Sequence, residues 1–278
     1  MHKSQHHTIF YPADQEELAS ACRVRESKPL LTKLPGALLV PHASYSGVLE
    51  LLHTGFSASA SVKPELVVVL GSLHQEPLED DAPHFLFAPS GEGISLPNGP
   101  VLFAQTIRDS LVAKFGQSLS IQDSYFIEES CIELTLPMVT SYFGSVPVLP
   151  ILSCSRGAKE SKSYAELLEN IVSMVPNTLF IVSANLNALL PSPLACTQTR
   201  SLIELLETGK PLLKAQKEKA ISSCGIASLD ALQRQKWGLS TWKFIALASQ
   251  GAQYASLPDT IDTKEKIVWH GTAIKGEM

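Results

Sequence analysis

Residues 66–74 read Leu-Val-Val-Val-Leu-Gly-Ser-Leu-His, an apolar run that ends in a histidine. A second such run, Gly-Ala-Leu-Leu-Val-Pro-His, occupies residues 36–42 and also ends in a histidine. Short apolar runs that stop at Pro or Gly are typical of buried parallel strands. In open α/β sheets, ligands bind beyond the carboxyl ends of such strands. The two runs therefore predict neighbouring strands that place His42 and His74 where both imidazoles can share one metal ion.

Strands and helices alternate along most of the chain. Further strands are expected over residues 146–152, 178–183, 242–247 and 267–274. Helical patterns cover residues 48–57, 130–143, 161–175, 196–207, 211–220 and 226–235. Asp14, followed by Glu17, predicts the N-cap of an additional first helix. The alternation predicts an α/β fold with a mostly parallel central sheet and helices on both faces, forming a single domain over residues 1–278.

The segment from Glu79 to Pro100 departs from this alternation because it is rich in proline and glycine. We expect one short strand over residues 84–88 and otherwise irregular chain that covers part of the sheet as a lid. Pro100 is interpreted as the first residue of a helix that runs to Phe115, since proline is favoured at that position.

Composition narrows the class of protein. The chain has 278 residues, 45% of them apolar, and a net charge of −5 with no Lys/Arg cluster, which argues against a nucleic-acid or anionic-membrane surface. It contains neither a signal-peptide core nor a stretch of ~18 apolar residues, so we expect a soluble, cytoplasmic protein. No nucleotide-binding loop and no G-x-S-x-G elbow is found. The oligomeric state stays open.

The five cysteines are scattered and include no C-x-x-C pair, which makes a disulfide framework or a thiolate zinc site improbable. Cys224 lies at an expected helix start, where the helix dipole lowers a thiol pKa. Its thiolate would complete a metal site with two histidines. The alternative is a buried thiol that acts as a small hydrophobe, just as each histidine alone is more often a loop residue at a strand end.

Polar residues also follow the strand expected over 178–183. Asn185 and Asn187 would face the same crevice as the two histidines and orient a substrate, although turn chemistry is the alternative. Residues 128–133 could place a carboxylate near the site, although a helix start, where acidic residues favour the dipole, is the preferred interpretation. His270, in the last expected strand, is interpreted as structural.

Six short motifs come in the order seen in Memo-like proteins. They are Tyr-Pro-Ala-Asp at 11–14, Pro-His-Ala-Ser-Tyr-Ser-Gly at 41–47, Gly-Ser-Leu-His at 71–74, Ile-Glu-Leu-Thr-Leu-Pro at 132–137, Val-Leu-Pro-Ile-Leu at 148–152 and Ser-Cys-Gly at 223–225. The chain resembles this family, which includes the AmmeMemoRadiSam system protein B. The family in turn is similar to the catalytic subunit of class III extradiol dioxygenases, which are non-haem iron enzymes. The resemblance implies that fold and a metal-binding set of His42, His74 and Cys224.

The chain departs from the family beside this set. The family has Ser-Asp-Phe-x-His where this chain has residues 183–187, so its Asp and His correspond to Ala184 and Asn187. Alanine can neither accept a proton nor orient a ligand, and asparagine cannot carry a proton at neutral pH. The resemblance thus implies a metal site whose acid/base groups are altered.

Two imidazoles and a thiolate favour Cu, Zn or Fe(II) over Mg or Ca, and the resemblance favours iron or copper over zinc. One hypothesis is a metal-dependent oxidoreductase in which Asn185, Asn187 and Tyr45 bind the substrate. The alternatives are a catalytically silent Memo-like protein whose crevice binds a peptide or small molecule, and a metal carrier or sensor.

Overall fold

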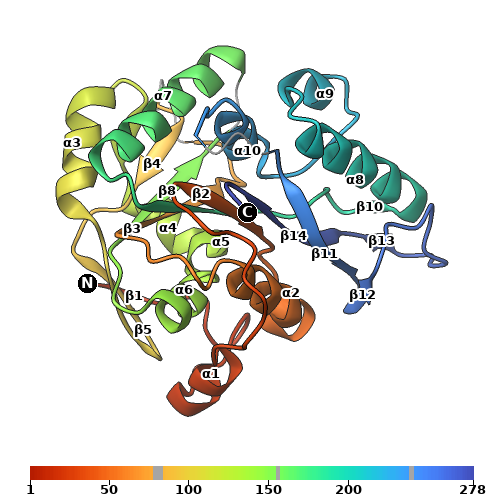
Figure 1. Cartoon of the computed structure of the whole chain (residues 1–278), viewed down its shortest axis with the longest axis horizontal. Helices are drawn as coiled ribbons and strands as arrows, with labels where there is room; N and C mark the ends of the chain where they lie inside the picture. The colour runs from red at the N-terminus through yellow and green to blue at the C-terminus, as the bar shows by residue number, and fades with distance from the viewer. Residues whose placement is uncertain (78–83, 155–156, 238–240) are drawn as a thin grey trace.

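The computed structural model describes residues 1–77, 84–154, 157–237 and 241–278. Within these residues a sheet of nine strands runs through the molecule (Figure 1). Its strands are β2 (Gly36–Val40), β3 (Leu66–Ser72), β4 (Leu86–Ala88), β7 (Leu119–Ile121), β8 (Val148–Ser153), β9 (Thr178–Ser183), β11 (Lys243–Ser249), β12 (Ala252–Tyr254) and β14 (Trp269–Lys275). Their order across the sheet is β12-β11-β14-β2-β9-β3-β8-β4-β7. Shorter strands pair beside it: β1 (His2–Lys3), β5 (Gly93–Leu96) and β6 (Gly99–Leu102) together, and β10 (Leu190–Pro191) with β13 (Lys266–Ile267).

The centre of the sheet is parallel. Strands β2, β9, β3 and β8 all run in the same direction, and every residue of these four strands is buried. Burial on both faces explains why the sequence runs are continuously apolar instead of alternating. Helical crossovers make the parallel order possible, since two parallel neighbours cannot be joined by a tight turn.

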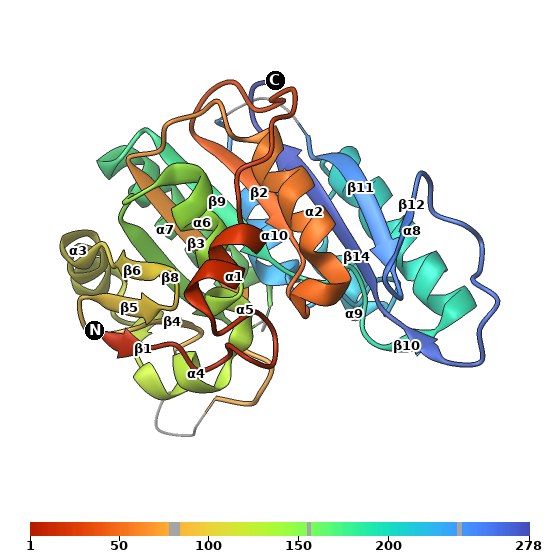
Figure 2. The ribbon, with the colours of Figure 1, turned by 90° about the horizontal axis from the view of Figure 1, so that it is seen from below.

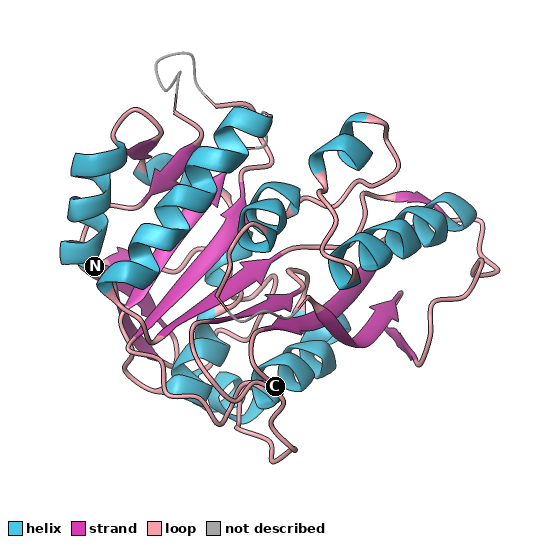
Figure 3. Cartoon of the chain, turned by 45° about the horizontal axis from the view of Figure 1, so that its top comes forward, coloured by secondary structure: helices cyan, strands magenta, loops and turns pink. Residues whose placement is uncertain are grey.

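Helices cover both faces of the sheet (Figures 1 and 3). The helices are α1 (Gln15–Ala21), α2 (Tyr45–Ala58), α3 (Gln105–Phe115), α4 (Asp123–Glu128), α5 (Ser130–Glu133), α6 (Leu136–Phe143), α7 (Ala158–Met174), α8 (Ser192–Glu207), α9 (Leu213–Lys217) and α10 (Ile226–Gln233). Figure 2 brings α1, α2, α5 and α6 in front of the sheet, with α7 and α8 behind it. No helix in the described part of the chain has the length and apolar composition that crossing a membrane requires.

The predicted α/β class with helices on both faces is confirmed, but the sheet is mixed. Strand β14 is antiparallel to both β2 and β11, and β4 is antiparallel to β8. Within this sheet, parallel pairing joins the four central strands to one another and β4 to β7. Because β14 runs against β2, its first residues lie at the edge where the parallel strands end.

Two of the predicted helices differ from those observed. Pro100 lies in β6, which pairs with β5 in a hairpin, and helix α3 begins only at Gln105, so the prediction of a helix from Pro100 is wrong. The helix expected over residues 130–143 is divided into α5 and α6, and Pro137 stands at the start of the second. Proline lacks the N–H that a continuous helix would need there. By contrast, Asp14 caps α1 as predicted and accepts the backbone N–H of Glu17 at 2.9 Å.

The segment predicted as a lid, Glu79 to Pro100, is described only in part. Residues 79–83 lie outside the described residues, and the remainder forms β4, β5 and the start of β6. Its role as a lid stays a prediction.

Helix α2 packs so closely on β2 and β14 that only glycine fits at one position. A Cβ atom added at Gly55 would lie 2.3 Å from Thr272 Oγ1 and 3.1 Å from Leu38 Cδ1. We predict that Gly55→Ala destabilises the protein by about 1–3 kcal/mol, the usual cost of overpacking. Gly47→Ala, in the same helix with nothing within 4 Å of the added Cβ, is the control and should be neutral or stabilising. Urea unfolding of both variants measures the difference, and equal midpoints would contradict the prediction.

Candidate metal centre

His42, His74 and Cys224 come from three separate segments and meet at one edge of the sheet. His42 follows β2, His74 follows β3, and Cys224 lies in the loop before α10. The strands β2 and β3 are not neighbours as predicted, because β9 lies between them. Their parallel direction nevertheless brings both carboxyl ends to the same edge, so the two histidines still face each other.

The three side chains are close enough to hold one ion. One ligand atom from each lies within 4.8 Å of the other two. The Nε2 atom of His42 is 3.8 Å from the Sγ atom of Cys224, and the two imidazole rings are 5.3 Å apart in an edge-to-face arrangement. A tetrahedral ion with ordinary bond lengths sets nitrogen and sulfur about 3.5 Å apart. Small side-chain movements therefore suffice, and the residues fit a transition metal.

Glu129 fixes the orientation of His74. Its carboxylate accepts the backbone N–H of His74 at 2.5 Å and the ring Nδ1–H at 2.7 Å. Since a carboxylate only accepts, Nδ1 must carry a proton and Nε2 is the atom available to a metal. This carboxylate–histidine pair is the arrangement usually found behind histidine ligands. The sequence favours a helix-start role for Glu129 over a place near the site, but its carboxylate makes no capping hydrogen bond to α5 and bonds to His74 instead.

His42 is oriented by the strand between the two histidines. Ser183, the last residue of β9, donates its hydroxyl proton to the carbonyl of Cys131 at 2.6 Å. Its oxygen therefore accepts from Nδ1 of His42, at 3.4 Å. Nε2 of His42 is then the ring nitrogen that faces Sγ of Cys224, and it is the atom available to a metal.

The thiol of Cys224 is partly exposed and surrounded by donors. Burial alone would raise its pKa, but His42, His74 and the backbone N–H of Asn185, 3.3 Å from the sulfur, lower the pKa to about 6. The thiolate and the Glu129 carboxylate in turn raise the pKa of His74 to about 10. At neutral pH without an ion, the site is thus a thiolate next to an imidazolium, and a metal would displace the Nε2 proton of His74.

Asn185 connects the loops that carry two of these residues. Its Nδ2 donates to the carbonyl of His42 at 3.4 Å, and its own carbonyl accepts from Ser223 at 2.6 Å. Its Oδ1 accepts from Nδ1 of His270 at 2.9 Å. His270 is half-buried, and desolvation followed by the charge of His42 lowers its pKa to about 4. The histidine interpreted as structural therefore stands, neutral, directly behind the candidate centre.

Asn187 and Tyr45, the other predicted substrate ligands, are directed elsewhere. The Oδ1 of Asn187 accepts from the backbone of Trp269 at 2.6 Å, and its Nδ2 donates to carbonyls of the chain. Tyr45 is buried and donates to the carbonyl of Leu134 at 2.8 Å. Both polar groups are bonded to the protein's own backbone, so the structure does not bring either of them to the three candidate ligands. Ala184 is fully buried and adds no polar group.

An α/β sheet with two histidines and a thiolate converging at its strand ends defines a protein with a candidate transition-metal centre. The family model described as Memo-like protein matches residues 3–240, and the chain belongs to the Memo-like family.

Curated relatives of this chain are named MEMO1 family proteins. MEMO1 family proteins of Thermotoga maritima and Thermotoga petrophila are 25% and 24% identical over 244 residues, covering 81% of this chain and 84% of each relative. The crystal structure of an uncharacterized protein, JW3007 from Escherichia coli K12, covers 87% of this chain and 99% of its own, with a TM-score of 0.52 and 12% identity. This last likeness concerns the fold alone.

The ionised state of Cys224 predicts a specific pH dependence. We expect iodoacetamide to alkylate this residue in metal-free protein with a half-maximal rate near pH 6, because only the thiolate reacts. Below that pH the thiol is protonated and the rate falls. In His42→Ala the midpoint should move upward, since one of the groups that stabilise the thiolate is lost. Mass spectrometry locates the label; the other cysteines, Cys22, Cys131, Cys154 and Cys196, are buried and serve as internal controls. A midpoint near 9 in the unaltered protein would contradict the prediction.

Proposed function

We propose that the protein binds one transition-metal ion through His42, His74 and Cys224. The observation that carries this proposal is the convergence of three donor atoms within 4.8 Å from segments that are far apart in the chain. In both histidines the protein engages Nδ1, through Glu129 for His74 and Ser183 for His42, which leaves Nε2 for a metal. In a chance cluster of polar side chains, we would not expect the same ring nitrogen to be available in both histidines.

The donor set narrows the choice of ion. Two imidazoles and one thiolate suit copper, zinc or iron(II) and disfavour magnesium and calcium, which prefer oxygen ligands. Three protein ligands leave coordination positions open for a small molecule or for oxygen. Membership of the Memo-like family and its similarity to extradiol dioxygenases favour iron or copper. When bound, such an ion would supply electron transfer to or from a molecule bound beside it.

Oxidoreductase chemistry is our first interpretation of the open site, with a small molecule as substrate. The polar side chains around the three ligands are already engaged, because Glu129 bonds to His74 and Asn185 bonds to His270. They are therefore better suited to holding the ligands in place than to transferring protons to or from a substrate. Ala184 and Asn187 stand where the family has Asp and His. These altered residues favour the second candidate, a silent Memo-like protein that carries or senses metal or binds a ligand without turnover.

Metal content tests the site itself. Protein purified without a histidine tag and loaded with one equivalent of Fe(II), Cu or the spectroscopic probe Co²⁺ should retain one ion per chain. We expect His42→Ala and Cys224→Ala to lose the stoichiometric ion, and Glu129→Gln to bind about 10–100-fold more weakly through loss of the bond that orients His74. Titration followed by elemental analysis measures this. His84→Ala, a histidine bonded to the carbonyl of Gly116 instead, is the control. An unaltered protein without metal, matched by every variant, would refute the proposal.

Oxygen consumption separates the two candidate uses of the site. With iron or copper bound and a reductant added, an oxidoreductase should consume oxygen continuously, and Cys224→Ala should stop consumption because the thiolate ligand is lost. A carrier or silent binding protein should retain its ion and show no sustained consumption above free metal. An oxygen electrode records the difference, and metal-retaining protein without consumption would reject turnover while leaving metal binding intact.

A further inference from the structure

Helix α5 lies behind both candidate histidine ligands. Glu129, which immediately precedes the helix, holds the backbone and the ring of His74. The carbonyl of Cys131, inside the helix, accepts from Ser183, whose oxygen faces the ring of His42. One short helix and the residue before it therefore set the orientation of both imidazoles.

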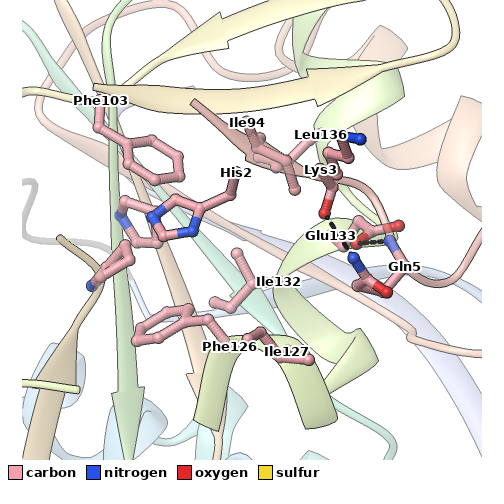
Figure 4. A pocket seen from close by; sticks show the side chains of 12 residues that line it. His2, Lys3, Gln5, Ile94, Phe103, Phe126, Ile127, Ile132, Glu133 and Leu136 are labelled. Atoms are coloured by element: carbon pink, nitrogen blue, oxygen red, sulfur yellow. Dashed lines mark hydrogen bonds between the residues drawn. The ribbon is translucent and has the colours of Figure 1, made fainter. Parts of the chain in front are cut away.

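The other end of this helix is attached to the N-terminal residues 2–11, here called the N-terminal strap. Glu133, the last residue of α5, is buried, and its carboxylate accepts the backbone N–H groups of Gln5 and His6, each at 2.9 Å. The phenol of Tyr11 donates to the same carboxylate at 2.6 Å. Figure 4 shows Glu133 and Gln5 side by side at the edge of a small cavity. All three donors to Glu133 thus belong to the strap.

The strap closes over an apolar cavity. Its first strand, β1, pairs with β5, and His2 lies over Phe103 with a ring separation of 6.1 Å (Figure 4). The cavity beneath has a volume of about 30 Å³ and is lined on its other sides by Phe126 and Ile132, among others. That volume holds about one water molecule, so the strap is seated in contact with the body of the protein.

Removing the strap would take away the three donors that fix the Glu133 carboxylate, and water would take their place. The end of α5 would then no longer be held by the strap and would be free to shift. Burial and the Glu133 carboxylate raise the pKa of Tyr11, so its phenol keeps the proton that it donates. A shift of α5 would move both Glu129 and the carbonyl of Cys131.

We propose that the N-terminal strap, acting through Glu133 and α5, controls the affinity of the His42–His74–Cys224 site for a transition-metal ion. Glu133 and Tyr11 are positioning residues, since neither contacts the three ligands. The proposal rests on the metal binding proposed above. Coupling between two sites is reciprocal, so an ion at the site must also hold the strap in place. A molecule that binds or cleaves the strap would thereby release the ion.

Two measurements test this coupling on the full chain. In a Co²⁺ titration we expect Tyr11→Phe and Glu133→Gln to weaken binding roughly tenfold, within the usual range of such couplings. In hydrogen exchange, Co²⁺ should slow the amides of Gln5 and His6 several-fold in the unaltered protein. The slowing should be smaller in Tyr11→Phe and absent in His42→Ala. A purely structural role for the strap would not make its exchange respond to metal.

Tyr142→Phe is the matched control, because its phenol bonds to His53 and Ser57 on α2 and not to α5. If Tyr11→Phe and Glu133→Gln bind Co²⁺ as Tyr142→Phe does, and hydrogen exchange at Gln5 does not change with metal, the coupling is refuted while the metal site stands. If even the unaltered protein fails to bind Co²⁺, the metal site and the coupling both fail. Should Glu133→Gln not fold, Tyr11→Phe alone decides between these outcomes.

Discussion

The carboxylate of Glu129 is the contact on which the candidate centre depends. It engages the backbone N–H and the ring of the same histidine, so it fixes both the path of the loop after β3 and the direction in which the imidazole faces. An exposed histidine on a loop would otherwise sample several rotamers and both tautomers. With Nδ1 occupied, only Nε2 remains free, and it faces the thiolate. The affinity of any ion here therefore depends on a residue that does not touch it.

The thiolate of Cys224 and the imidazolium of His74 stabilise each other. Without an ion, a proton on His74 neutralises the charge of Cys224, and the pKa values of about 6 and about 10 express that mutual stabilisation. The folded chain thus holds its three donors close together before any ion arrives. A metal replaces one proton and meets a site that needs little rearrangement, which lowers the cost of ordering on binding.

Part of this arrangement was predictable from the sequence because it follows from local patterns. Continuous apolar runs identified β2, β3 and β9, and a histidine directly after two of them placed the site at the strand ends. The order of the strands was not predictable, since the insertion of β9 between β2 and β3 depends on pairing between distant segments. The hairpin at Pro100 was missed for a similar reason, because the local sequence around a proline fits a helix start and an edge strand equally well.

The roles of Glu129 and His270 were not predictable from local sequence. Each was assigned a common local role, and only contacts between distant segments show which residues they bond to. For Asn187 the error runs the other way. It was predicted to orient a substrate, but its side chain accepts a hydrogen bond from the backbone of Trp269 in β14.

The ligands lie at positions 42, 74 and 224, and this spacing has a consequence for biosynthesis. A chain emerging from the ribosome exposes both histidines long before the thiol is made, and β9, which separates the two histidine-bearing strands, is also late. A partly made chain therefore offers only two unsupported imidazoles, which hold an ion weakly. Full coordination appears only after the four central parallel strands have been made, so ion capture would follow assembly of the centre of the sheet and would stabilise the folded protein against unfolding by mass action.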